Sequence, residues 1–434
     1  MHDEPALLIV PPPFLAEPAF ARLLAALPDA RVVGGAVRDT LAERPVADID
    51  LGTKLAPAEV TAALRRAGIR AVPTGLDHGT VTAVLDAPVG GQDAAVGGGR
   101  SVEITTLRRD VATDGRHATV AFTDDWRQDA ARRDFTINAM SMTRDGAVHD
   151  YFGGIADLRA GVLRFVGDPA QRIAEDFLRV LRYFRFFARY AARPPEAPKL
   201  PESGVRDALR AGIPGLATLS AERVWSELRR ILNAPDPGAA VALMAELGVL
   251  GAVIPEGADA AALARLIAAG APADGLLRLA ALLTGDVGHF ADRLKLSGAE
   301  RQRLLDLRAT PLARPEDDDA ALRRLLADHD RALLINRTWL IDRTGLVAEA
   351  LAGAAQPDWT ALRARLAGLP KPVFPLQGSD VLALGVPPGP RVGALLRAVR
   401  DWWVAGGCTA GVAECRAELA RASGGPLAGP LAPG

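Results

Sequence analysis

Several residues and motifs that mark other classes of protein are scarce or missing in this chain of 434 residues. Only two cysteines are present, Cys408 and Cys415, and their spacing fits neither a zinc knuckle nor a disulfide framework, so we expect packing residues. No apolar run reaches transmembrane length and no signal-peptide pattern is found. We therefore expect a cytoplasmic protein with no membrane partner.

The chain also has little net charge and few lysines. The formal net charge of −1 argues against a strongly basic coat that binds nucleic acid nonspecifically, although it leaves room for local basic patches. The two common nucleotide-binding loops, Gly-x-Gly-x-x-Gly and the Walker loop ending in Gly-Lys-Ser/Thr, do not occur at the glycines discussed below. A dinucleotide fold and a P-loop fold are thus disfavoured.

What is present is a folded composition that changes character near residue 165. Hydrophobic residues make up 49% of the chain and charged residues 24%, and the length requires more than one core. Before residue 165 the patterns predict a mixed α/β domain; after it, apolar spacing is helical nearly throughout. The predicted strands cover 30–33, 49–52, 81–85, 102–107 and 141–143, the predicted helices cover 36–41 and 58–67, and a Gly-rich loop covers 87–100.

The most informative motif is a pair of aspartates, Asp48 and Asp50, placed after the turn Gly34-Gly35-Ala36-Val37-Arg38-Asp39. Alternate residues of a strand project from the same face, so both carboxylates can reach one cluster of hard divalent cations. Glycines let a triphosphate approach backbone N–H groups, and Arg38 can grip phosphate oxygens with two N–H groups. The motif favours metal-dependent nucleotidyl transfer, but a solvated loop or a calcium ligand pair is the commoner explanation of Asp-x-Asp alone.

Glu103 is the best candidate for a third catalytic carboxylate. It alternates with Val102 and Ile104 on a predicted strand, so it should face away from the core. An ordinary surface glutamate would show the same pattern.

A second constellation runs Arg132-Arg133-Asp134-Phe135-Thr136-Ile137-Asn138-Ala139-Met140. It places charged groups among apolar ones, which is costly unless each charge finds a partner. In the functional interpretation, Arg133 contacts a triphosphate and Asp134 or Asn138 contacts ribose hydroxyls. In the structural interpretation, Asp134 and Asn138 brace a helix and Arg133 pairs with a carboxylate.

A third constellation runs Glu175-Asp176-Phe177-Leu178-Arg179-Val180-Leu181-Arg182-Tyr183-Phe184-Arg185. Its arginines recur every three residues opposite an apolar stripe, as on any amphipathic helix. The carboxylate of Asp176 one turn before Arg179 adds an acceptor beside a donor. That pair matches the edge of cytosine or adenine, where an amino group adjoins a ring nitrogen.

In this order the three motifs resemble those of class II CCA-adding tRNA nucleotidyltransferases and the related bacterial poly(A) polymerases. The resemblance covers about Arg31 to Glu256 and implies an α/β nucleotidyltransferase head with a polymerase-β-like mixed sheet, followed by an all-α neck, body and tail. It implies a catalytic head over 1–165, a base-reading, RNA-binding neck and start of the body over 166–257, and a tRNA-binding body and tail over 258–434. The segment 108–126 takes the place of the family's flexible loop.

The same resemblance assigns roles to single residues. Asp48 and Asp50 would bind Mg²⁺, and the nucleotide would be held and read by Gly35, Arg38, Arg133, Asp134, Asp176, Arg179, Arg182 and Arg185. The partners would be tRNA, CTP and ATP, and the reaction template-independent CCA addition. A poly(A) polymerase, or an enzyme adding only C or only A residues, shares every motif; a noncatalytic RNA-binding protein is the third alternative.

Overall fold

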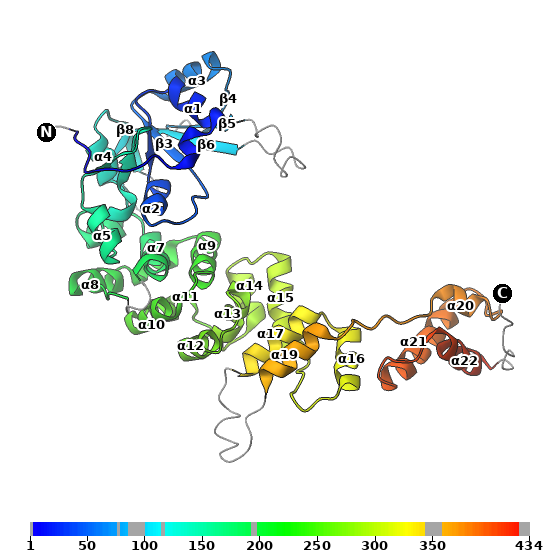
Figure 1. Ribbon diagram of the computed structural model, residues 1–434. Helices are drawn as coiled ribbons and strands as arrows, with labels where there is room; N and C mark the ends of the chain where they lie inside the picture. Colours follow the sequence, from blue (N-terminus) through cyan, green and yellow to red (C-terminus); the bar gives the residue numbers. More distant parts are fainter. Residues whose placement is uncertain are drawn as a thin grey trace. The chain divides into compact units, whose positions relative to one another are not determined.

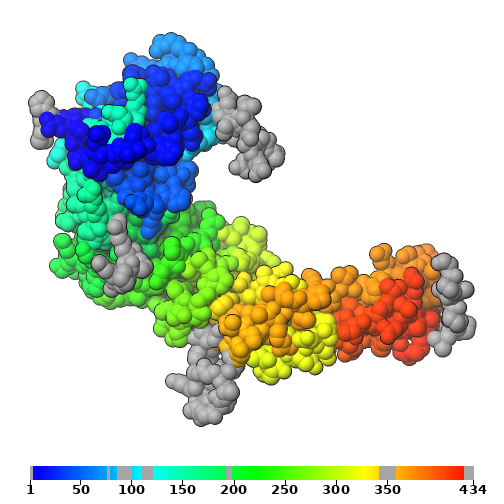
Figure 2. Space-filling model, viewed as in Figure 1, coloured from blue at the N-terminus to red at the C-terminus, as the bar shows by residue number. Residues whose placement is uncertain are grey.

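The computed structural model describes residues 3–75, 79–85, 100–113, 118–191, 198–342 and 358–424. The chain divides into two compact units, Met1–Pro255 and Glu256–Gly434. Figure 1 shows their elements, and Figure 2 shows the same chain space-filled, with the first unit in blue to green and the second in light green to red. Most of the predicted Gly-rich loop over 87–100 lies outside the described residues.

The first unit is built on an eight-stranded mixed sheet in the order β1-β10-β9-β2-β3-β6-β5-β4. Only β3 and β6 pair in parallel; every other neighbouring pair is antiparallel. This confirms the predicted mixed α/β head. The strands are β1 (Leu7–Leu8), β2 (Arg31–Val33), β3 (Asp50–Thr53), β4 (Arg70–Gly75), β5 (Thr80–Leu85), β6 (Arg100–Thr106), β9 (Met140–Met142) and β10 (Ala147–Asp150).

Strand β6 shows why the sheet forms where it does. Val102 and Ile104 are fully buried while Ser101 and Glu103 are exposed, as period-two alternation requires. Helix α3 packs beside β4 and β5 and closes one side of the sheet. The helices of this part of the unit are α1 (Pro18–Ala26), α2 (Gly35–Leu41), α3 (Pro57–Arg66), α4 (Trp126–Ala131) and α5 (Gly154–Ala160).

The segment 108–126, which the resemblance places at the family's flexible loop, contains regular structure. It forms a separate two-stranded antiparallel sheet of β7 (Arg108–Thr113) and β8 (Ala118–Phe122), followed by the start of α4. The sequence signal for this hairpin was the Asp114-Gly115 dipeptide between segments rich in β-branched residues. Residues 114–117 themselves lie outside the described part of the chain.

After residue 165 the first unit is helical, as the apolar spacing predicted. Its α-helices are α6 (Pro169–Glu175), α7 (Leu178–Phe186), α8 (Ser203–Ala211), α9 (Ala221–Leu232), α10 (Gly238–Leu247) and α11 (Val249–Val253). Phe135 of the head is fully buried against aromatic rings that follow residue 160. Its ring centroid lies 4.8 Å from that of Phe165, 6.0 Å from Tyr183 and 5.3 Å from Phe186. This cluster ties α7 to the end of the sheet.

The start of α7 rests directly on a glycine. A Cβ atom built on Gly215 would lie 2.2 Å from the ring of Phe177, the N-cap residue of α7. Gly215 belongs to the short 3-10 helix Ile213–Thr218 and is buried. Any larger side chain there must displace Phe177, and Phe177 adjoins Asp176.

The named elements of the second unit, in its described part, are all helices, and Ala258 and Leu283 form an isolated antiparallel β-bridge. Its helices are α12 (Ala260–Ala268), α13 (Gly275–Leu282), α14 (Val287–Arg293), α15 (Gly298–Ala309), α16 (Asp319–Asp328), α17 (Arg331–Asp342), α19 (Trp359–Gly368), α20 (Gly378–Leu382), α21 (Pro390–Ala405) and α22 (Val412–Ser423). Cys408 and Cys415 are buried, unpaired and packed in one apolar cluster with Trp403, which confirms that they are packing residues. Among the described helices, none is long and apolar enough to cross a membrane.

Candidate active site

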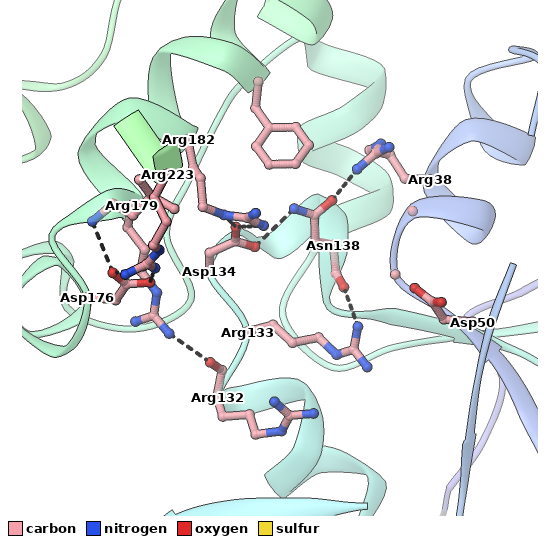
Figure 3. A pocket seen from close by; sticks show the side chains of 14 residues that line it. Arg38, Asp50, Arg132, Arg133, Asp134, Asn138, Asp176, Arg179, Arg182 and Arg223 are labelled. Atoms are coloured by element: carbon pink, nitrogen blue, oxygen red, sulfur yellow. Dashed lines mark hydrogen bonds and ion pairs between the residues drawn. The ribbon is translucent and has the colours of Figure 1, made fainter. Parts of the chain in front are cut away.

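A polar cavity of about 450 Å³ in the first unit brings the sequence motifs together (Figure 3). Eight of the predicted site residues line it: Gly35, Arg38, Asp50, Arg133, Asp134, Asp176, Arg179 and Arg182. The remaining lining residues are Gly34, Arg132, Asn138, Leu178, Phe186 and Arg223. Three predicted residues, Asp48, Glu103 and Arg185, are not among those that line it.

The turn before α2 depends on Gly34. Its φ of +67° lies in the left-handed region, and a Cβ there would come within 2.9 Å of an Nη atom of Arg133. Glycine thus satisfies both the backbone conformation and the close approach of a guanidinium from a distant part of the chain.

The carboxylates meet at the start of β3. Asp50 is its first residue and stands in register with Glu103 on the parallel strand β6, while Asp48 lies just before the strand. Burial and repulsion from Glu103 raise the pKa of Asp50; the charge of Arg133 opposes the rise and that of Asp48 adds to it. Negative charge is therefore concentrated here beyond what the nearby arginine neutralises.

These oxygens fit a hard divalent cation. Mg²⁺ is commonly held by one or two carboxylates, with substrate phosphates and water completing its shell. Within the described residues no group of three or more His, Cys, Asp or Glu side chains forms a ready-made metal cage. Water and bound phosphates would fill the remaining positions of such a shell.

A chain of hydrogen bonds crosses the cavity wall. Arg38 donates from Nη1 to Oδ1 of Asn138 at 2.5 Å, and Nδ2 of Asn138 donates to Oδ1 of Asp134 at 2.9 Å. Arg182 of α7 donates from Nε to the other oxygen of Asp134 at 2.7 Å. Burial would raise the pKa of Asp134, but Arg182 and Asn138 together lower it. Asp39 forms an ion pair with Arg38 at 2.9 Å and is thus a local partner of that guanidinium.

The predicted helix around Asp134 and Asn138 is wrong. Phe135 forms a β-bridge with Phe165, and only Thr136–Asn138 turn, as a short 3-10 helix. The bridge draws this segment towards 164–166 and away from helical geometry. The bracing bond between Asn138 and Asp134 nevertheless exists without a helix.

Asp129 is a functional candidate that the sequence reasoning missed. This buried carboxylate on α4 accepts from Nε of Arg132 at 2.8 Å and from Nη2 of Arg133 at 3.1 Å. Burial would raise its pKa, but the charges of the two arginines lower it. Spacings of three and four residues on a helix were the signal available for this pairing. Asp129 orients the arginine that stands beside Gly34.

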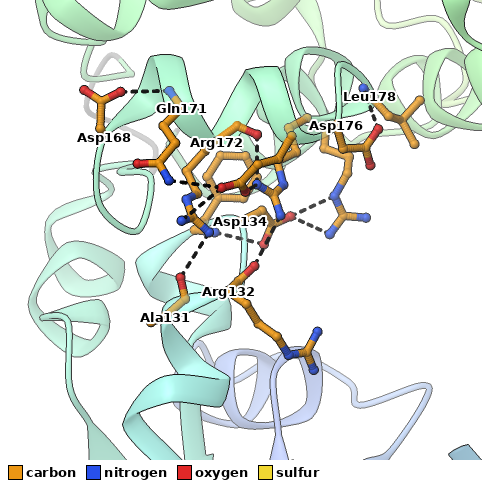
Figure 4. A network of polar contacts seen from close by, with 12 residues as sticks. Ala131, Arg132, Asp134, Asp168, Gln171, Arg172, Asp176 and Leu178 are labelled. Atoms are coloured by element: carbon orange, nitrogen blue, oxygen red, sulfur yellow. Dashed lines mark hydrogen bonds and ion pairs between the residues drawn. The ribbon is translucent and has the colours of Figure 1, made fainter. Parts of the chain in front are cut away.

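Four charged side chains at the start of α7 and along it each have a protein partner. Figure 4 labels one of them, Asp176, which accepts from the backbone N–H of Leu178 at 3.1 Å. Nη2 of Arg223 lies 3.1 and 2.9 Å from the two oxygens of Asp176. Arg179 donates to Glu175 at 2.6 Å and to the backbone oxygen of Arg132 at 3.2 Å. The remaining two are Arg182, bound to Asp134, and Arg185, which donates from Nε to Glu227 at 2.6 Å.

The sequence comparisons decide the family. The head matches the model described as "Poly A polymerase head domain" over residues 30–164, and residues 201–260 match "Probable RNA and SrmB- binding site of polymerase A". The chain is 35% identical to CCA tRNA nucleotidyltransferase 1, mitochondrial, of Danio rerio, over 86% of this chain and 83% of the relative. The chain belongs to the CCA tRNA nucleotidyltransferase family.

Other members agree with this assignment. The human CCA tRNA nucleotidyltransferase 1, mitochondrial, is 34% identical over 86% of this chain and 82% of its own length. A crystal structure of the Bacillus stearothermophilus CCA-adding enzyme in complex with CTP superposes with a TM-score of 0.67 at 27% identity, covering 94% of this chain and 98% of that one. As a member of this family, the chain is a nucleotidyltransferase, and its fold is that of the CCA-adding enzymes.

Proposed function

We propose that this enzyme adds CMP and AMP from CTP and ATP to the 3′ end of tRNA without a nucleic-acid template. The observation that supports the proposal is a cavity lined by Asp50, by arginines of residues 30–164 and by charged side chains of residues 166–257. It combines groups for the triphosphate and groups for a base in one place. We place the activity in the cytoplasm, with Mg²⁺ as the cation.

The reaction is attack of the RNA 3′-hydroxyl on the α-phosphate, with loss of the hydroxyl proton and departure of pyrophosphate. Mg²⁺ held by Asp48 and Asp50 would lower the pKa of that hydroxyl and offset charge on the phosphates. Gly35 gives the triphosphate access to the backbone, and Arg38 and Arg133 neutralise its oxygens. Glu103 adds negative charge beside Asp50. Catalysis of this kind rests on positioning and electrostatics.

Base choice is assigned to the neck. Asp176 would accept from the amino group of cytosine or adenine while Arg179 donates to the neighbouring ring nitrogen. Asp176 has capacity for this, because a carboxylate offers about four acceptor positions and the protein fills three, two from Arg223 and one from the N–H of Leu178. Asp134, Arg182 and Arg185 belong to the proposed nucleotide-binding set, with Asp134 or Asn138 nearest the ribose.

The test uses purified enzyme, Mg²⁺ and tRNA that ends at the discriminator base. CTP and ATP are supplied separately and together, and products are separated at single-nucleotide resolution. Discrete addition of three residues with both nucleotides is the expected result. A long ladder with ATP alone would replace CCA addition by poly(A) synthesis, and addition that stops after C residues or requires a preformed CC end would indicate a partial activity.

A further inference from the structure

In the described part of the second unit, two arginines lack the carboxylate partners that their neighbours have. On α15, Arg301 pairs with Asp292 and Arg303 with Asp274. Arg308, near the end of the same helix, and Arg337 on α17 form no ion pair with any carboxylate of the described residues. Both side chains are half-buried.

The bonds that these two arginines do make are to helix ends. Arg308 donates from Nη2 to the backbone oxygen of Leu283, the C-cap residue of α13. Arg337 donates from Nη1 to the backbone oxygen of Leu307, in the last turn of α15, at 3.4 Å. The Nε atoms of both are buried and have no hydrogen-bond partner. A guanidinium has five N–H groups, so each side chain retains donors.

The positive charges of Arg308 and Arg337 are also poorly compensated by their surroundings. Burial lowers the pKa of Arg308, and burial together with the positive charge of Arg308 lowers the pKa of Arg337. Arginine still remains protonated in water-exposed or buried settings near neutral pH. The two helix C-termini supply only about half a negative charge each. Within the described residues, these two close, half-buried positive charges therefore have no carboxylate as a counter-charge.

We propose that Arg308 and Arg337 form a binding site for a phosphate oxyanion, supplied in the working enzyme by the backbone of the bound RNA. Two guanidiniums with spare N–H groups suit the several oxygens of a phosphate better than a single carboxylate. The choice of RNA as the source rests on the proposed function; the anion site itself rests on the second unit alone. A free phosphate ion has the same chemistry and is the competing source.

The first experiment measures equilibrium binding of tRNA lacking its CCA end, without nucleotide, over a range of salt concentrations. Arg308→Gln and Arg337→Gln should each weaken binding several-fold and reduce the slope of log Kd against log salt by about one. Arg303→Gln is the matched control, because it removes the same charge from α15 at a carboxylate-paired position and should leave the slope unchanged. Arg308→Lys and Arg337→Lys keep the charge and should keep the slope.

The second experiment distinguishes the two sources by thermal melting in sodium phosphate and in sodium chloride of equal ionic strength. Phosphate should raise the Tm of the wild-type enzyme and not that of the double Gln variant. If phosphate stabilises only the wild type while tRNA slopes are equal in all variants, RNA is excluded as the source. If neither tRNA slope nor phosphate response differs, the site does not exist.

A third measurement covers the case in which the Gln variants do not fold. Hydrogen exchange of the wild-type enzyme with and without tRNA should show protection at the end of α15 and in α17, and no protection there would overturn the proposal. Nucleotide incorporation is assayed separately. An enzyme that adds no nucleotides but shows the slope change refutes the proposed function and retains the site.

Discussion

Asp50 adds negative charge at the start of β3. Its raised pKa means that ionisation of this carboxyl group lowers the free energy of unfolding. A carboxyl group whose pKa is higher in the folded state than in the unfolded state disfavours folding once it ionises. This destabilising effect is absent at pH values below the pKa of the unfolded state. It grows as the pH rises towards and through the pKa of the folded state. Without divalent cations, the enzyme therefore carries more of that penalty as the pH rises.

The first prediction follows from this effect. In EDTA at pH 7, Asp50→Asn should raise the Tm by about 2 °C, since it removes repulsion from Glu103 and Asp48. Added Mg²⁺ should raise the Tm of the wild type and much less that of the variant, and incorporation should be lost. The exposed Asp207 on α8 provides the control, because Asp207→Asn should move neither Tm. A lower Tm of Asp50→Asn in EDTA would show that its carboxylate is a structural group.

The second prediction concerns base choice. Asp176→Ala should reduce discrimination against UTP and GTP more than it reduces the rate with CTP and ATP. A carboxylate oxygen that faces the carbonyl of a wrong base repels it, and deletion of the carboxylate removes that repulsion along with the correct hydrogen bond. Single-nucleotide incorporation with each of the four triphosphates measures the effect, with Asp207→Ala as the control. Unchanged preference with a loss of folding would make Asp176 a structural partner of Arg223.

For single residues, the sequence motifs predicted most of the side chains that line the cavity. They did not predict which of these side chains pair with one another. Arg38, Arg133 and Asp176 were found because each stands in a short motif. The contact of Arg223 with Asp176 joins residues 47 positions apart, and no local pattern encodes such a pair. The pairing of Asp129 could have been predicted, since it lies one helical turn before Arg132 and Arg133. Its burial, however, depends on the tertiary fold.

At the scale of elements, α7 is held to α9 by one buried ion pair. Arg185 of α7 donates to Glu227 of α9, whose side chain is almost fully buried. Removing one member of a buried pair leaves the other charge uncompensated, which typically costs about 3–5 kcal/mol. The contact therefore fixes the helix that carries Arg179 and Arg182.

The third prediction tests this role. Glu227→Gln should lower the free energy of unfolding by about 3 kcal/mol in a denaturant titration, while the ratio of CTP to UTP incorporation stays unchanged. Glu246, whose pair with Arg206 is exposed, gives the comparison, and Glu246→Gln should cost less than about 1 kcal/mol. Altered base preference at unchanged stability would mean that the pair serves the proposed nucleotide-binding role of Arg185 and does not hold α7 against α9.

Two elements with a clear hydrophobic pattern, one strand and one helix, were predicted to within one residue at each end. The strand expected over 81–85 is β5 at Thr80–Leu85, and the helix expected over 36–41 is α2 at Gly35–Leu41. Strand β4, Arg70–Gly75, was missed because it lies at the sheet edge and buries none of its side chains fully. Edge strands are specified by a neighbour's backbone more than by their own side chains, so their sequences carry a weak signal.

At the scale of the whole molecule, chemistry and RNA affinity should separate. The fourth prediction is that Asp48→Ala abolishes turnover while tRNA binding stays within a few-fold, because affinity for nucleic acid comes mainly from contacts to many phosphates. Filter binding with tRNA lacking its CCA end, beside an incorporation assay, provides both readouts. Loss of binding in parallel with turnover would mean that the carboxylates organise the RNA site too.

Gly215 has a consequence for how such an enzyme can be altered by selection. Because the ring of Phe177 occupies the space where a Cβ would stand, every substitution at 215 acts through Phe177 on the adjacent Asp176. A directed-evolution library that randomised only nucleotide-contacting positions would never sample this route. If Asp176 reads the base as proposed, a library that includes position 215 should give variants whose fidelity changes while the residues proposed to meet the base stay the same.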